Sequence, residues 1–152
     1  MGLAGKIKPM RWFKPTPRRS TGPLSESEIA RRTPVWVALS DLFLDTEMQD
    51  FTRRHIAETI ERATYSIAEA EAILRDEVAP VFFVTLLSVA GEWAGWSDAY
   101  VRDTVLEHLR ARQRRWSLLA RLRRRNADRT WRIVAPDWEK IKRLLAKPGT
   151  PD

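Results

Sequence analysis

The sequence contains no cysteine, and only two of its 152 residues are histidines. Without cysteine the chain cannot form a disulfide framework, a thiolate metal site or a cysteine nucleophile, and a reducing cytoplasm is its expected location. His55 and His108 each stand alone on a predicted helix, where packing or surface roles are more common than catalysis. We therefore expect no catalytic residue, no metal ligand and no cofactor, and a protein that is not an enzyme.

Long apolar runs are also missing. The most apolar stretch, residues 78–90, holds thirteen residues, whereas a membrane-spanning helix needs about 20. The first 20 residues are basic but lack the apolar run of a secretion signal. We expect no transmembrane segment.

Charge is distributed unevenly along the chain, whose net charge is +7. Eight basic and two acidic side chains give residues 1–32 a charge of +6, five basic and fourteen acidic ones give residues 33–109 a charge of −9, and fourteen basic and four acidic ones give residues 110–152 a charge of +10. Four prolines lie among the basic residues before Ser25, and proline is poorly compatible with a helix interior or a central strand. We predict a disordered basic arm over 1–24, a single helical domain over 25–146 and a flexible tail over 147–152.

Helical spacing of apolar residues predicts an all-α fold, an irregular bundle of about five to six helices. Ser25 with Glu28, and Ser66 with Glu69, have the spacing of a capping box at a helix start. A helical turn is predicted from Ser25 to Arg32, followed by helices from Pro34 to about Leu44 and from Asp45 or Thr46 to Ala63, the latter with Phe51 on its apolar stripe. Two more helices are predicted from Ser66 to Val78 and from Pro80 to Gly91. A long fifth helix from Ser97 to about Arg125, a short extended piece from Thr130 to Val134 and a last helix from Pro136 complete the prediction.

Carboxylates gather at the first helix junction, where Asp41, Asp45, Glu47 and Asp50 lie close in sequence. They could bind a hard cation or act as acid and base, but calcium loops need a glycine turn that is missing here. Helix capping and the helix dipole account for most of the cluster. After residue 90, two tryptophans on a glycine-flanked turn either anchor a partner or close the core. The candidate partner-binding residues are Asp41, Asp45, Glu47, Glu92, Trp93 and Trp96.

Arginines mark the predicted fifth helix, on which Arg110, Arg114, Arg121 and Arg125 fall within roughly 60° of one another. Such a face could follow the phosphate backbone of a nucleic acid, with Trp131 as a stacking platform. It could also be a solvated surface, or lie against the acidic middle of the same chain with help from apolar contacts. An anionic membrane or an acidic protein is a further possible target of this face.

Three segments, TPVWVALSDLFLDTE, YSIAEAEAILRDEVAPV and AGEWAGW, resemble a family of uncharacterised bacterial proteins known only as a domain of unknown function. The resemblance covers about Thr33 to Leu109. It implies a bacterial source and one compact helical domain, and it carries no functional residue.

The leading hypothesis is a non-enzymatic bacterial binding protein that acts through a protein partner. One form of it is an immunity-type inhibitor of a basic toxin, since complementary charge accelerates association. The first alternative is a nucleic-acid-binding protein that uses the arginine face and the basic arm. The second is an enzyme that uses carboxylates and a lone histidine.

Overall fold

Helices account for the regular structure in the part of the chain that the structure describes. The computed structural model covers residues 23–44, 47–86, 96–114 and 120–147, with side chains except at 84–86, 113–114 and 120–127. Residues 1–22 of the predicted arm and 148–152 of the predicted tail lie outside it. The described elements are α1 (Glu26–Ser40), η1 (Asp41–Phe43), α2 (Asp50–Arg62), α3 (Ile67–Ile73), η2 (Leu74–Val78), α4 (Ala79–Leu86), α5 (Asp98–Arg114) and α6 (Ala120–Ala146). The predicted all-α fold is confirmed.

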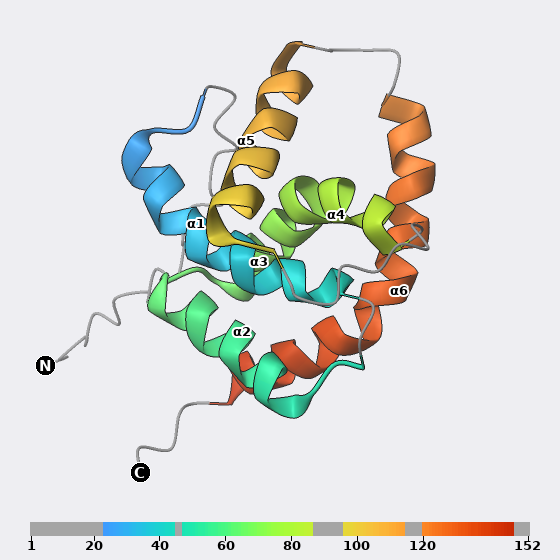
Figure 1. Cartoon of the computed structure of the whole chain (residues 1–152). Helices are drawn as coiled ribbons and strands as arrows, with labels where there is room; N and C mark the ends of the chain where they lie inside the picture. Colours follow the sequence, from blue (N-terminus) through green and yellow to red (C-terminus); the bar gives the residue numbers. More distant parts are fainter. Residues whose placement is uncertain (1–22, 45–46, 87–95, 115–119, 148–152) are drawn as a thin grey trace, which may run out of the picture.

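The helices pack around α1 and the segment from α3 to α4 (Figure 1). One side is formed by α5, which packs on α1, and the opposite side by the long α6, which packs on α2 and α4. Trp36 of α1 and Trp138 of α6 have no exposed surface at all. The other large, fully buried side chains are Phe43, Phe82, Leu39, Ile56, Ile60, Leu74, Ile141, Val35, Val78 and Val101.

The predicted cap at the start of α3 is confirmed. The Ser66 hydroxyl accepts from the backbone N–H of Glu69, and the Glu69 carboxylate accepts from the backbone N–H of Ser66 at 2.8 Å. The start of α2 was predicted wrongly, because the helix begins at Asp50 with Gln49 as its N-cap, and no side chain caps it. Asp45 and Thr46, the predicted caps, lie outside the described residues.

Three prolines that were predicted to open helices lie inside continuous helical segments instead. Pro34 lies within α1, Pro136 lies within α6, and Pro80 follows a π turn, η2, that joins α3 to α4 without a break. The predicted extended piece from Thr130 to Val134 is therefore wrong, because α6 runs straight through it. All three prolines are exposed. A proline in a helix leaves the carbonyl four residues earlier without its helical donor, and on the outer face of the helix that carbonyl can be paired by water or by a side chain.

The predicted single helix from Ser97 to Arg125 is also wrong. The first helix, α5, ends at Arg114, and α6 begins at Ala120, while residues 115–119 lie outside the described residues. The two helices lie on opposite sides of α4 and run in opposite directions (Figure 1). None of the described helices combines the length and the hydropathy that crossing a membrane requires.

Candidate functional site

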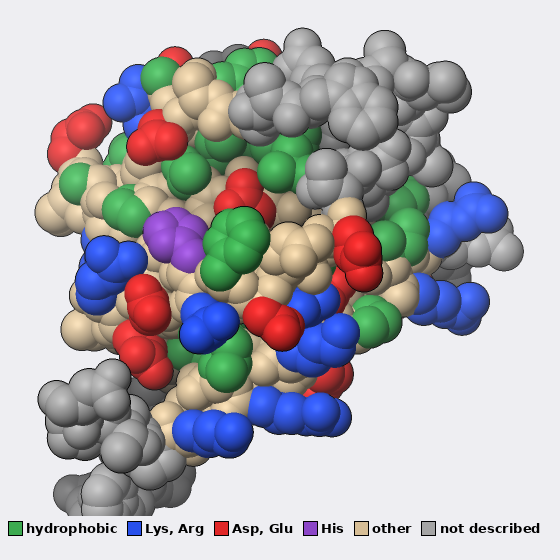
Figure 2. Space-filling view, turned by 60° about the horizontal axis from the view of Figure 1, so that its bottom comes forward, with side chains coloured by type: hydrophobic (Ala, Val, Ile, Leu, Met, Phe, Trp, Pro, Cys, Tyr) green, Lys and Arg blue, Asp and Glu red, His purple; other side chains and the backbone are tan. Residues whose placement is uncertain are grey.

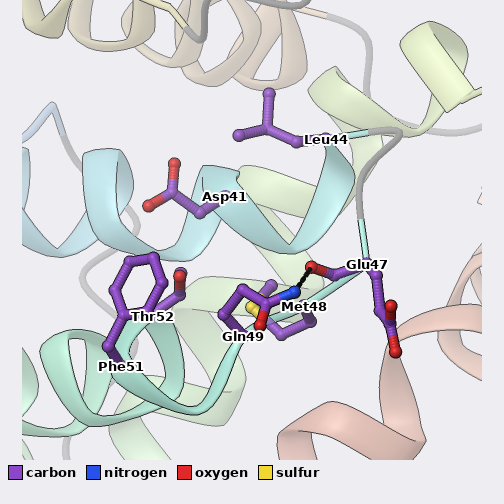
Figure 3. Close-up of a pocket in the computed structure, with 7 residues that line it drawn as sticks. All are labelled: Asp41, Leu44, Glu47, Met48, Gln49, Phe51 and Thr52. Atoms are coloured by element: carbon purple, nitrogen blue, oxygen red, sulfur yellow. Dashed lines mark hydrogen bonds between the residues drawn. The ribbon is translucent and has the colours of Figure 1, made fainter.

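A pocket of about 330 Å³ opens where η1 gives way to the start of α2. Its walls include two of the predicted partner-binding residues, Asp41 and Glu47 (Figure 3). The other lining residues are Leu44, Met48, Gln49, Phe51 and Thr52.

Burial of the neighbouring residues fixes the shape of this junction. Leu42 and Phe43 of η1 are buried in the core, and the N–H of Leu44 donates to the carbonyl of Asp41 at 3.3 Å. This turn leaves Asp41 and Leu44 half-buried at the rim. On the far side of the pocket, the Gln49 amide donates to the backbone carbonyl of Glu47 at 3.1 Å. The pocket wall is therefore anchored to the core on one side and by this local hydrogen bond on the other.

Asp41 is the half-buried charge of this pocket. Burial raises the pKa of its carboxyl above the ordinary value, and the nearby His55 offsets part of that increase. Within the described residues, no side chain donates a hydrogen bond to this carboxylate or forms an ion pair with it. Asp41 also follows the last residue of α1, where the helix dipole disfavours a negative charge. A titratable group perturbed in this way inside a pocket is a candidate for a functional residue.

The two carboxylates of the pocket do not converge. In Figure 3 the side chain of Glu47 points away from Asp41, and Met48 and Gln49 lie between them. No group of three or more potential metal-ligating side chains occurs among the residues that the structure describes. Since the carboxylates are separated, the pocket offers two independent negative charges rather than a paired acid and base.

Phe51 supplies an apolar surface beside these charges. Its side chain is 70% exposed, although the sequence placed it on the buried stripe of its helix. Phe51 precedes Ile60 by nine residues, about two and a half helical turns, so it lies on the opposite side of α2. Met48 packs partly against the core. The pocket thus combines an exposed aromatic ring, a thioether and a half-buried carboxylate.

Of the remaining predicted partner-binding residues, Trp96 is the one that the structure describes, and it does not line this pocket. Trp96 is half-buried, stacks on Phe82 with ring centroids 4.6 Å apart and packs against the core. Of the two interpretations of this tryptophan, its contacts agree with closing the core. Asp45, Glu92 and Trp93 lie outside the described residues.

The predicted arginine face does not lie on one helix. Arg110 is exposed on α5, Arg114 ends the same helix, and Arg121 and Arg125 belong to α6. The side chains of Arg114, Arg121 and Arg125 lie outside the described residues. Nucleic-acid binding by these residues stays a prediction, but it can no longer rest on a single helical face.

Trp131, the predicted stacking platform, is half-buried. The guanidinium of Arg75 lies 3.5 Å from the centre of its ring, and this cation–π contact covers one face. The histidines lie on different helices, with His55 exposed on α2 and His108 half-buried on α5.

A buried polar cluster was missed at the level of sequence. The indole N–H of Trp36 donates to the carboxylate of Glu77 at 2.7 Å, and Arg32 forms an ion pair with the same carboxylate. Arg32 also pairs with Glu28 at 2.9 Å, and the Tyr65 hydroxyl donates to Glu28 at 3.1 Å.

These contacts change the acidity of two groups in the cluster. Burial and the neighbouring Glu28 raise the pKa of Tyr65 to about 12. Burial alone would raise the pKa of Glu28, but hydrogen bonds from Arg32 and Tyr65 hold it below its ordinary value. The cluster ties α1 to η2 and to the start of α3, and it is closed by its own members. Its role is therefore structural.

Comparison with known proteins adds a family to these observations. A family model described as a domain of unknown function, DUF7079, matches residues 30–144. No curated protein and no solved structure matches the chain. The sequence resemblance to a domain of unknown function is confirmed, and the match extends beyond the predicted end at Leu109, into α6.

Proposed function

The chain belongs to the DUF7079 family, whose function is unknown, and we propose that it is a non-enzymatic binding protein whose pocket at Asp41 and Phe51 receives a basic side chain of a protein partner. One observation carries this proposal. Asp41 keeps a half-buried carboxylate that is paired with no described residue, beside an aromatic ring that is 70% exposed.

The chemistry of the pocket selects the partner. An arginine or lysine that enters it would neutralise Asp41, and charge-assisted hydrogen bonds to a half-buried carboxylate are among the stronger polar contacts. The aliphatic stem of the same side chain would pack on Phe51 and Met48. Aromatic residues, phenylalanine included, are enriched at the core of protein–protein interfaces. We therefore expect a segment in which a basic residue stands next to an apolar one.

An immunity-type role is one form of this proposal. If the partner is a toxin that binds nucleic acid, the lysines or arginines that contact the phosphates are its basic residues, and a pocket of this kind would cover one of them. We place the encounter in a bacterial cytoplasm, because a chain without cysteine needs no oxidising compartment.

Selection from a random peptide display library on the immobilised full-length protein tests the proposal. We expect the selected peptides to carry arginine or lysine beside an apolar residue. Their affinity should fall about tenfold or more in Asp41→Asn and in Phe51→Ser, because truncating a hot spot costs about 2 kcal/mol or more and about 1.4 kcal/mol is already tenfold.

Two matched controls come from α5, where Asp103→Asn removes an exposed carboxylate and Tyr100→Ser removes an aromatic ring that is 50% exposed. Their affinities should match the wild type. Selection of no peptide, or of peptides that bind Asp41→Asn and Phe51→Ser as well as the wild type, would refute the proposal.

A further inference from the structure

A row of basic side chains follows the outer face of α6. With about 100° of rotation per residue, four exposed cations fall within about 80° of one another on this helix, and a fifth follows directly after the helix ends. The buried residues of α6, among them Val134, Trp138 and Ile141, lie on the opposite side. The α6 basic row consists of Arg129, Arg132, Lys140 and Arg143 of α6 together with Lys147, the residue that follows the helix.

Most of this charge is not neutralised within the described structure. Of the five cations, only Lys140 has a carboxylate within ion-pair distance among the described residues, and that contact, with Asp137, is 3.7 Å long. Asp137 itself accepts two shorter hydrogen bonds from Arg53, at 2.9 and 2.8 Å. Figure 2, which turns the underside of Figure 1 toward the viewer, shows Lys and Arg side chains along the lower and right edges of that face.

The length of the row matches an extended polyanion rather than a single anion. From Arg129 to Arg143 the helix rises about 21 Å at about 1.5 Å per residue, and Lys147 follows one residue after the end of the helix. A nucleic-acid duplex carries one negative charge for about every 1.7 Å of its axis. Five cations along this length can therefore each reach a different phosphate.

The apolar side of α6 argues against a membrane surface. A helix that lies in a bilayer interface buries its apolar face among the lipids, but that face of α6 is already buried in the core of the protein. Ile133, which is 50% exposed, is the one large apolar side chain among the exposed described residues of α6. The row therefore offers charge with little apolar area.

Among the described residues of α6, the lack of free aromatic rings argues against binding of single-stranded nucleic acid. Proteins that bind single-stranded nucleic acid stack its bases on aromatic side chains. In the described part of α6, Trp138 is fully buried and Trp131 is half-buried under the guanidinium of Arg75. Of the parts of a nucleic acid, the phosphate backbone is therefore the one that this surface can bind.

We propose that the α6 basic row binds the phosphate backbone of a nucleic-acid duplex, without regard to base sequence. The residues differ from the arginines of the predicted fifth helix, and the proposal is independent of the pocket at Asp41. Since each cation releases one counterion when it meets a phosphate, the binding constant should depend steeply on salt.

Fluorescence anisotropy with a labelled 20-base-pair DNA duplex, over a salt series, tests this proposal on the full chain. The five cations alone give a slope of about −4.5 in log K against log salt, or a loss of about 500-fold between 50 and 200 mM. The triple variant Arg129→Ala/Arg132→Ala/Arg143→Ala should reduce the steepness of that slope by about 2.7.

A charge-matched variant separates this surface from the net charge of the protein. Arg54→Ala/Arg62→Ala/Arg102→Ala also removes three exposed arginines, but from α2 and α5, and it should keep a slope close to that of the wild type. Circular dichroism checks that both variants remain folded.

Four results would overturn the proposal: no duplex binding at 50 mM salt, equal slopes for the two triple variants, tighter binding to the single strand than to the duplex, or binding to phosphatidylserine vesicles in place of DNA. If the basic residues of the amino-terminal arm carried the binding, both variants would keep the wild-type slope, which is the second of these results.

Discussion

Replacing Glu77 with alanine should lower the free energy of unfolding by about 3 to 5 kcal/mol. Glu77 is only 9% exposed, and its carboxylate holds the indole of Trp36 and the guanidinium of Arg32, which are themselves largely shielded from water. Without it, the indole N–H of the fully buried Trp36 loses its acceptor, and an unsatisfied buried donor costs about 1 to 3 kcal/mol. Arg32 keeps its contact with Glu28 at 2.9 Å, which limits the remaining cost.

Two further variants divide this cost between its sources. Glu77→Gln keeps an oxygen that can accept from Trp36 but removes the charge that faces Arg32, so it should cost less than Glu77→Ala. In the double variant Arg32→Ala/Glu77→Ala the two partners leave together. Its destabilisation should be smaller than the sum of the two single effects by about 1 to 3 kcal/mol.

Urea unfolding followed by tryptophan fluorescence and by far-ultraviolet circular dichroism measures these differences. The midpoint should shift while the slope stays constant, because the surface exposed on unfolding hardly changes. A decrease of less than about 1 kcal/mol in the free energy of unfolding for Glu77→Ala, or additive effects of Arg32→Ala and Glu77→Ala, would show that the carboxylate does not stabilise the packing between α1 and η2.

Two other predictions concern the pocket and the caps. Asp41→Asn should raise the stability at pH 7 by a few tenths to about 1 kcal/mol, because the charged carboxylate is half-buried at the carboxyl end of α1. A raised pKa favours the protonated form of Asp41 in the folded state. The gain in stability should therefore shrink as the pH falls through the folded pKa and vanish below the unfolded value of about 3.9. Thermal melts at pH 3 and pH 7 test this, and an equal gain at both pH values would contradict it. Ser66→Ala should cost about 0.5 to 2 kcal/mol in urea unfolding, because the Ser66 hydroxyl contacts both the backbone N–H and the carboxylate of Glu69. Ser97→Ala should cost less, because the Ser97 hydroxyl accepts from the backbone N–H of Tyr100, which carries no carboxylate to reciprocate. The reverse order would contradict the capping interpretation.

Local signals predicted much of the fold. The Ser66 and Glu69 pair begins a helix as expected, because a capping box satisfies backbone groups within four residues and needs no distant partner. Two of the carboxylates at the first helix junction, Asp41 and Glu47, line one pocket, and their role in binding stays a prediction. What the sequence did not show was which way each side chain points. Phe51 is exposed because α2 begins at Asp50 and its core-facing side is set by Ile56 and Ile60.

Helix boundaries were predicted wrongly at three prolines, for one physical reason. A proline within a helix leaves the carbonyl four residues earlier without its usual donor. For Pro80 that carbonyl belongs to Asp76, which accepts from the guanidinium of Arg112 at 3.1 Å. The donor lies 36 residues further along the chain, so no local pattern could indicate it. Tertiary contacts and solvent thus make a helix-breaking residue tolerable.

Tertiary structure also decides how charge is distributed, because the net charge of a segment does not show which of its charged side chains lie on the surface. Within the acidic middle, Glu77 is buried, Glu69 caps α3, and Glu71 accepts from Trp138 and pairs with Arg75. These carboxylates hold the helices together and are largely unavailable to a partner. The cations of α6 face outward, and most of them have no carboxylate partner among the described residues. The pocket at Asp41 and the α6 basic row are therefore two surfaces of opposite charge, the first able to meet a basic side chain of a partner and the second spread from Arg129 to Lys147.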